Sequence, residues 1–281
     1  MEILRVLLLT MIIFIPLERI LAIRNQKVFR QNWRNDTVFW IANIFAIGSI
    51  LTIVIAIAMF AGRRWMAGLQ GAVHSQPEWL QFVEILLIAD LGFYLAHRAM
   101  HAVPCLWRLH VVHHSIEELD WLAGFRAHPL DQSIVKSASV VPVFLLGFSS
   151  NAIGAYFLLY AWQSVFLHSN VKIRFGPGLR WLLATPEFHH WHHTKDGAIR
   201  DKNFAGQLPF LDAIFGTAYM PKGRRPTSFG IVEPMRQHYL LQFVMPFRRT
   251  KTRPDTTPAE ASRDSPHRAA VGDTRGKHQS R

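Results

Sequence analysis

The chain has 281 residues, a formal net charge of +12, and a composition that is 50% hydrophobic. Its apolar residues fall in long blocks, which is typical of a membrane protein and argues against a water-soluble enzyme. The charge does not indicate nucleic-acid binding, because the basic residues flank apolar blocks or lie in the C-terminal tail, as expected from the positive-inside bias and attraction to lipid headgroups. The single cysteine, Cys105, excludes an intrachain disulfide and a thiolate metal cluster.

Three apolar segments occupy the first part of the chain. Residues 3–23 predict a retained membrane helix rather than a cleaved signal peptide, since no small-residue cleavage site follows them. Residues 38–61 contain no charge and, at about 1.5 Å per residue, can cross the ~30 Å hydrocarbon layer. Two glycines and a proline predict a loop over residues 62–77. Residues 79–96 carry two acidic residues, which predicts that this helix faces a polar site.

Two shorter apolar arms follow, at residues 134–148 and 152–167. Each is short for a full crossing, so the pair is interpreted as a tight hairpin or a re-entrant unit. Pro142 predicts a kink in the first arm. The sequence therefore predicts an all-α membrane protein with about four transmembrane or re-entrant helices and a cytoplasmic, histidine-rich helical cap.

The chain is divided into four parts on composition. These are N-terminal membrane helices (1–78), a histidine-rich part (79–220), a C-terminal extension (221–249) and a disordered basic tail (250–281). Residues 24–37 hold four Lys or Arg residues and residues 62–78 hold two. This difference predicts a multi-pass protein whose segment 24–37 and histidine groups lie on the cytoplasmic side.

Eleven of the fifteen histidines fall between residues 97 and 193, in groups with regular spacing. Residues spaced i, i+3 or i, i+4 share one face of a helix. The groups are His97 and His101; His110, His113 and His114; and His189, His192 and His193. His128 and His168 lie singly beside the apolar arms. Neutral imidazole binds zinc, iron, copper or nickel, so the repeated spacing predicts metal binding.

The number of histidines suggests how many metal ions are bound. A tetrahedral zinc site uses four ligands and a catalytic one usually keeps three from the protein. Eight to ten histidines exceed the needs of one ion and suit two, with four or five each. The paired Glu-x-x-His pattern of carboxylate di-iron bundles does not occur on two helices here, so ligation is predicted to be almost wholly imidazole.

Three motifs resemble the histidine boxes of the fatty acid hydroxylase/sterol desaturase superfamily. They are HRAMH (97–101), HVVHH (110–114) and HHWHH (189–193). Three flanking motifs agree with the same resemblance, namely RAHPLD (126–131), LHSN (167–170) and DAIFGT (212–217). The resemblance covers about residues 79–220.

This resemblance implies two Fe ions, with O2 as co-substrate, that hydroxylate or desaturate an unactivated C–H position of a sterol, fatty acyl or ether lipid. It carries over the eight box histidines as metal ligands and adds His168 as a ninth. His128 also matches, although a helix-capping or supporting role competes with ligation there. His190 is interpreted as a non-ligand at the rim of the site.

Three further residues are candidates for the catalytic machinery. Asp90 and Tyr94 precede His97 by seven and three residues and so share its helix face. Asp90 is expected to accept the second ring N–H of a ligand histidine, with a salt bridge to an arginine as the alternative. Asn170 is expected to bond a metal-bound water, with helix capping as the alternative.

The sequence contains no haem, flavin, nicotinamide or iron–sulfur motif. A separate electron donor is therefore predicted, ferredoxin- or cytochrome-like with its reductase, together with a lipid substrate drawn from the bilayer and no nucleic acid. A zinc-dependent membrane hydrolase acting on a lipid is the alternative, with metal-bound water as nucleophile. A metal transporter is disfavoured, because the histidines gather on one side of the membrane. Hydroxylation, desaturation and ether cleavage all remain open.

Overall fold

The computed structural model describes residues 2–233 and 235–248, so the tail predicted for residues 250–281 lies outside the described part. Within it the chain is helical throughout, with two isolated β-bridges and no strand, which confirms the all-α class. The helices are α1 (Glu2–Ile20), α2 (Trp33–His74), α3 (Glu78–Ala102), α4 (Pro104–His114), η1 (Ala123–Phe125), α5 (Pro129–Leu146), α6 (Ser150–His168), α7 (Leu179–Leu182), α8 (Pro186–His192), α9 (Phe210–Ile214), α10 (Tyr239–Val244) and η2 (Met245–Phe247).

The helix ends follow local chemistry. Prolines occupy the first turn of α4, α5 and α8, where the missing N–H costs nothing. Ser149 caps α6 by accepting from the N–H of Ala152. Gly147 ends α5 in the left-handed conformation, with φ of 73°, which glycine adopts without strain. The two predicted apolar arms are therefore the helices α5 and α6, joined by residues 147–149, and α5 stays helical through Pro142.

The loop predicted over residues 62–77 is wrong, because α2 continues without interruption to His74. A glycine inside a helix costs only about 1 kcal/mol relative to alanine, which packing can offset. Here Gly62 gives room to the side chain of Leu145 on α5, and Gln70 donates to the carbonyl of Leu145 at 2.9 Å. Tertiary contacts with α5 thus extend the helix past its weak positions.

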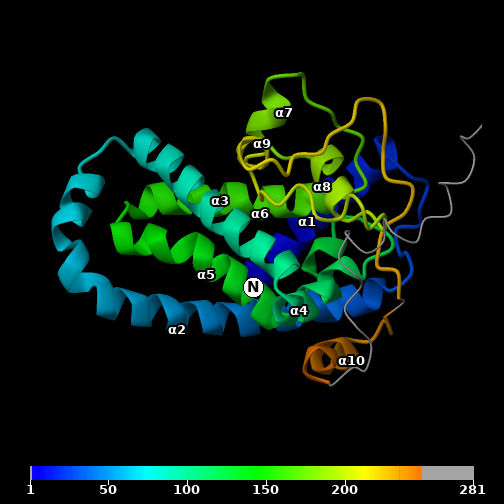
Figure 1. The fold of residues 1–281 in the computed structure, drawn as a ribbon, viewed down its shortest axis with the longest axis horizontal. Coiled ribbons are helices and arrows are strands. Elements are labelled where there is room, and N and C mark those ends of the chain that lie inside the picture. Colours follow the sequence, from blue (N-terminus) through cyan, green and yellow to red (C-terminus); the bar gives the residue numbers. More distant parts are fainter. Residues whose placement is uncertain (1, 234, 249–281) are drawn as a thin grey trace, which may run out of the picture. The chain divides into compact units, whose positions relative to one another are not determined.

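The long helices pack around α5 and α3. Helix α5 lies against α2 and α3, and α6 also lies against α3. The core between them includes Ile85, Ala89, Val143 and Tyr156, all nearly fully buried. In Figure 1 the short helices α7, α8 and α9 gather near one end of these long helices. That end holds the histidines described below.

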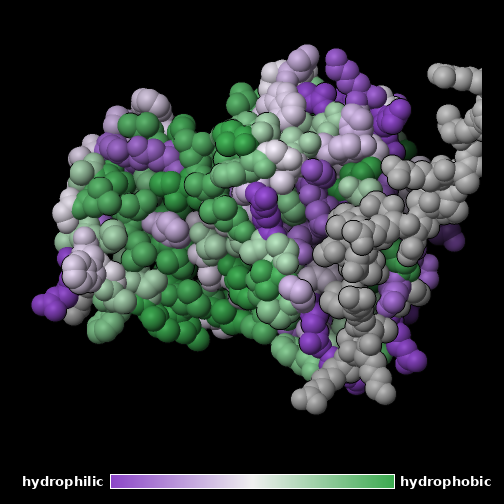
Figure 2. Space-filling model, in the orientation of Figure 1, coloured by the Kyte–Doolittle hydropathy of each residue, from purple (hydrophilic) through white to green (hydrophobic). Residues whose placement is uncertain are grey.

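Two helices are long and apolar enough to cross a membrane by length and composition, Trp33–Gly62 of α2 and Glu78–Ala102 of α3. Their outward faces are apolar rather than polar. On α3 every fourth residue is an exposed hydrophobic one, namely Trp79, Val83, Leu87, Leu91 and Leu95. Figure 2 shows hydrophobic residues covering the face formed by α2, α3 and α5, while hydrophilic residues gather over the short helices. A surface of this kind is suited to lipid, and the chain is membrane-associated.

The polar segment between α1 and α2 is partly built into the protein. Arg30 is buried and forms salt bridges with Asp36 at 2.6 Å and with Asp120 at 2.8 Å. Asp36 also pairs with Arg126. Arg30 is one of the four Lys and Arg residues of segment 24–37, but it pairs with these two carboxylates inside the protein and is not available to lipid headgroups.

Candidate metal centre

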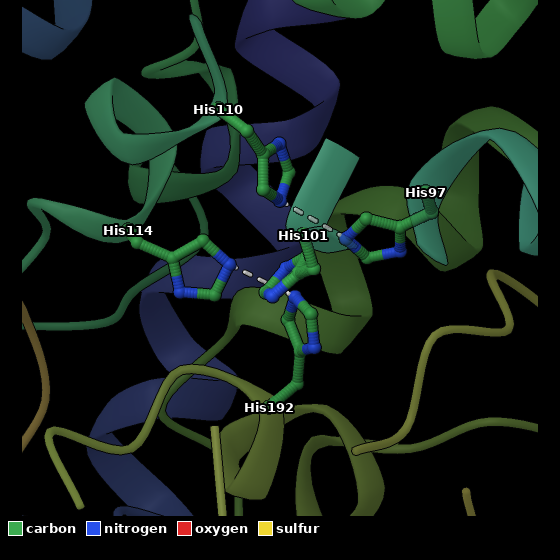
Figure 3. A group of neighbouring side chains, drawn as sticks. All are labelled: His97, His101, His110, His114 and His192. Carbon is green, nitrogen blue, oxygen red and sulfur yellow. Dashed lines mark hydrogen bonds between the residues drawn. The ribbon is translucent and has the colours of Figure 1, made fainter. Parts of the chain in front are cut away.

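Nine histidines converge into two buried groups, each of which could hold one metal ion. Group one contains His97, His101, His110, His114 and His192, and Figure 3 shows their rings turned toward a common centre. Group two contains His113, His168, His189 and His193. Within each group the ligand atoms lie within 4.8 Å of one another. The structure thus brings together all eight box histidines and His168.

Helices α4 and α8 each supply both groups. His110 and His114 are one helical turn apart and face group one, whereas His113 faces group two. On α8, His192 faces group one, and His189 and the C-capping His193 face group two. Adjacent residues on a helix point about 100° apart, so a helix lying between the groups serves both. The remaining ligands come from α3 for group one and from the end of α6 for group two.

The Nε2 atoms of neighbouring rings lie close together. In group one the Nε2 atoms of His97 and His110 are 3.1 Å apart, and those of His114 and His192 are 3.0 Å apart, as the dashed lines in Figure 3 mark. In group two the corresponding separations are 3.0 Å for His168–His189, 3.0 Å for His189–His193 and 3.3 Å for His113–His168.

The opposite ring nitrogens, Nδ1, mostly meet oxygen acceptors. Backbone carbonyls face four of them. Nδ1 of His97 lies 2.7 Å from the carbonyl of Phe204, and Nδ1 of His113 lies 2.9 Å from that of Arg126. His168 and His192 likewise meet the carbonyls of Ser164 and Lys202, both at 2.9 Å. An acceptor that cannot donate fixes the proton on Nδ1 and leaves the Nε2 lone pair facing inward.

Carboxylates perform the same task for two ligands in group one. The Nδ1 atom of His110 lies 3.0 Å from Asp131, and that of His101 lies 2.9 Å from Asp201. Asp131 is fully buried, whereas Asp201 is partly exposed. Sequence reasoning assigned neither residue a role, although Asp131 closes the motif RAHPLD, two residues after Pro129. Asp201 lies in irregular chain after α8, where spacing gives no signal.

This donor set fits metal ions. Inward Nε2 lone pairs about 3 Å apart repel each other unless a cation lies between them. A metal–imidazole distance of about 2.0–2.1 Å with ligands at right angles places neighbouring nitrogens about 3.0 Å apart, which is close to the observed separations. Burial also keeps these rings neutral and able to bind metal. It is the main reason why the pKa of His113 falls from 6.5 to about 4, and why the pKa values of His114 and His192 fall well below 6.5.

Asp90 does not contact a ligand histidine or an arginine, contrary to both predicted roles. Its carboxylate accepts three backbone N–H groups, from Gly206 at 2.8 Å, Gln207 at 3.0 Å and Leu208 at 2.7 Å. These residues follow Phe204, whose carbonyl holds His97. Asp90 therefore positions the loop that orients a ligand.

Tyr94 contributes to the same loop from the other side. Its hydroxyl lies 2.9 Å from the hydroxyl of Thr217, which donates to Asp212 at 2.6 Å. Asp212 in turn accepts the N–H of Phe204 at 2.7 Å. Tyr94 is thus a buried support of this chain of contacts, with its ring stacked on Phe215, rather than a group aimed at the histidines.

Two other predicted site residues lie apart from both groups. His128 caps α5, because its Nδ1 accepts the N–H of Leu130 at 3.2 Å, while its Nε2 lies 3.1 Å from the carbonyl of Phe243. The capping alternative therefore describes its position. Asn170 binds the backbone of Arg24 through both ends of its amide, at 2.9 and 2.7 Å. It anchors the segment after α1 and does not point at the metal centre.

His190 lies outside both groups, as expected for a non-ligand. It is buried against Phe229, and burial lowers its pKa to about 3, with Arg24 adding to the shift. It does stand in a Glu-x-x-His pattern with Glu187, but Glu187 pairs with Arg174 at 3.3 Å. This single pair therefore does not form a carboxylate-type metal site.

A small cavity of about 50 Å³ opens onto both groups. Its walls include His97 and His110 of group one, and His113, His168 and His189 of group two. Apolar walls come from Phe93, Val135 and Leu167, and polar ones from Gln132, Tyr160, Ser164 and Gln207. A molecule that enters this cavity would lie against both histidine groups.

Comparison with known proteins agrees with this site. The chain is 33% identical over 173 residues to the ornithine lipid hydroxylase OlsE of Rhizobium tropici, covering 62% of this chain and 52% of the relative. It is 30% identical over 158 residues to the alkylglycerol monooxygenase of Xenopus tropicalis, covering 56% of this chain and 33% of the relative. The chain thus spans about half or less of the length of these relatives. No solved structure matches it.

The family model of the fatty acid hydroxylases matches residues 82–217. All nine histidines of the two groups lie within this region. Over residues 82–217 the chain therefore matches the fatty acid hydroxylase family.

Proposed function

We propose that this chain is a membrane di-iron oxygenase that uses O2 and two electrons to hydroxylate or desaturate a lipid. The observation that carries the proposal is the convergence of nine buried Nε2 atoms into adjacent groups of five and four. The family match and the two relatives, which are named as a lipid hydroxylase and a monooxygenase, support the same reaction class. Group one would hold one ion and group two the other.

When bound, the iron pair would supply the activation of O2 and the oxidation of a C–H bond. The protein contributes geometry and exclusion of water. The carbonyl of Phe204 and the carboxylate of Asp131 hold protons on the outward nitrogens of His97 and His110, which keeps the inward nitrogens available. The apolar walls of the cavity, such as Leu167 and Val135, are buried and would hold the alkyl part of the substrate against the histidines.

A zinc-dependent hydrolase is the alternative, and two features of the structure favour the oxygenase. Nine imidazoles exceed the three or four ligands that one zinc ion takes. In zinc metalloproteases a glutamate takes the proton from the attacking water. Among the described residues that line the cavity there is no carboxylate.

We also propose the partner and the placement in the membrane. Electrons would come from a separate ferredoxin- or cytochrome-like donor with its reductase. Helices α2, α3, α5 and α6 would form the four transmembrane or re-entrant helices, and the histidine-bearing end would face the cytoplasm. The catalytic part would span residues 79–220, between the N-terminal membrane helices and the C-terminal extension.

The test is to purify the full chain in detergent, measure its metal content, and supply a reductase system, O2 and membrane lipids. We expect two irons per chain and O2-dependent formation of a hydroxylated or desaturated lipid. His113→Ala and His192→Ala, one in each group, should each abolish the reaction and reduce the iron content. One zinc per chain, with lipid cleavage that does not require O2, would show that the hydrolase is correct.

A further inference from the structure

The side chain of Gln207 has an unusual position in the cavity described above. It is only 2% exposed and lines the cavity that opens onto both histidine groups. Neither its amide oxygen nor its amide nitrogen has a hydrogen-bond partner among the described residues. The polar atoms of a buried amide normally form hydrogen bonds. Because neither polar atom of this amide does so within the described residues, both can bond a polar group of a molecule that enters the cavity.

The backbone around Gln207 explains why the side chain is held there. Its N–H donates to Asp90 at 3.0 Å, and its carbonyl accepts from the N–H of Ala184 at 2.8 Å and from Gln163 at 3.2 Å. These contacts hold the backbone of Gln207 against α3, against α6 and against the segment between α7 and α8. The backbone hydrogen bonds therefore hold Gln207 at the position where its side-chain amide lines the cavity.

The charge of the cavity wall limits the kind of group that Gln207 can bind. The described residues that line it include no Lys, Arg, Asp or Glu. A phosphate or a free carboxylate would therefore have no cationic side chain in the wall to pair with. An uncharged group with both a donor and an acceptor, such as an amide or a hydroxyl, can satisfy both ends of the Gln207 amide.

We propose that Gln207 is a specificity residue that binds a neutral amide or hydroxyl group of the lipid substrate. The inference rests on the proposed function, because it assigns a substrate class to the same site. Since His97, His168 and His189 line the same cavity as Gln207, the carbons next to this polar group are the ones that lie at the metal centre. Oxidation is then directed to carbons near the polar group and not to the far end of an alkyl chain.

The experiment compares two probes that differ in one hydrogen-bond donor. N-methylpalmitamide carries an N–H next to its carbonyl, whereas methyl palmitate has the same chain and an ester oxygen instead. Binding of each is measured by titration of the full-length, metal-loaded protein in detergent. We expect the wild-type protein to bind the amide at least about tenfold more tightly than the ester, because a site built around hydrogen bonds rejects a ligand that leaves them unmade.

Gln207→Leu removes both the donor and the acceptor with little change in size. It should reduce the tenfold preference for the amide to about twofold or less by weakening amide binding more than ester binding, with unchanged metal content. Gln207→Met is the second variant if the leucine form does not fold. Gln31→Leu, at an exposed position far along the chain, is the matched control and should behave as wild type. If the wild type shows no preference for the amide, or if the preference survives both Gln207 variants, the inference is wrong.

The outcomes separate this inference from the proposed function. A Gln207-dependent amide preference in a protein that oxidises no lipid would retain the binding site and overturn the oxygenase. O2-dependent oxidation of both probes at equal rates and affinities, unaltered in Gln207→Leu, would retain the oxygenase and overturn the role of Gln207.

Discussion

The metal centre depends as much on the groups behind the histidines as on the histidines themselves. In group one, Asp131 is fully buried and lies 3.0 Å from Nδ1 of His110. The contact with Nδ1–H of His110 favours the ionised form of this buried carboxyl. An ionised acceptor makes the imidazole a stronger ligand.

Asp131→Asn should weaken metal binding at group one by about 10–100-fold, because the amide keeps the shape but not the charge. Group two has no contact with this carboxylate and should keep its ion. Metal content after dialysis against a series of chelator concentrations measures both sites. Asp196→Asn, at an exposed position, is the control and should leave both ions bound. Equal loss of both ions in Asp131→Asn would contradict the independence of the two groups.

His128 offers a second test at this scale, because capping and ligation predict different outcomes. Its Nδ1 accepts the Leu130 N–H at the start of α5. His128→Ala should destabilise the protein by about 1 kcal/mol through the lost cap, and His128→Asn, with a good capping side chain, should restore most of that stability. Thermal melting is the measurement, with metal content determined in parallel. Loss of one ion from either variant would show that His128 is a ligand.

At the scale of the elements, close approach of helices sets where the histidine-bearing ends meet. Gly92 lies on α3 where this helix crosses α5, and a Cβ there would collide with the backbone carbonyl of Ala138. Backbone atoms cannot rotate out of the way as a side chain can. The glycine is therefore required for the spacing between α3, which carries His97 and His101, and α5.

Gly92→Ala should lower stability by about 1–3 kcal/mol, because the two helices must separate to admit the methyl group. Gly48→Ala is the matched control, since Gly48 is also inside a long helix but has no atom within 4 Å of its added Cβ. The control should be neutral or slightly stabilised, as alanine favours the helix. Melting temperatures of the two variants in the same detergent make the comparison. Equal melting temperatures would mean that α3 and α5 do not depend on this contact.

At the scale of the whole molecule, the placement in the membrane can be read from the two ends of α3. Cys105 is the single cysteine, is exposed, and lies just after α3. Ser75 lies just before α3, in the short connection after α2. If α3 crosses the bilayer, these two positions must lie on opposite sides of it.

A membrane-impermeant maleimide should label Cys105 in inside-out vesicles and not in intact cells, because we place the histidine-bearing end in the cytoplasm. The Cys105→Ala/Ser75→Cys variant should show the reverse pattern, and Cys105→Ala alone should give no label. Labelling of both positions from the same side would show that α3 does not cross. Labelling of Cys105 from outside would reverse the orientation.

The chemistry of the ligands was readable from the sequence because it is local. Spacing of three and four residues places His110, His113 and His114 along one side of a helix whatever the rest of the chain does. Apolar length and composition likewise predicted α3 and the two apolar helices α5 and α6. The prediction of a loop over residues 62–77 was wrong, because a glycine's cost of about 1 kcal/mol is smaller than the stabilisation that packing against α5 supplies.

Only the tertiary structure decided how the histidines are shared and what holds them. His113 and His114 are adjacent in sequence yet belong to different groups, because α4 lies between two clusters whose other members come from α3, α6 and α8. The roles of Asp90 and Gln207 likewise depend on a loop brought to α3 from more than a hundred residues along the chain. Sequence determines which donors a helix face carries, whereas long-range packing determines what each donor meets.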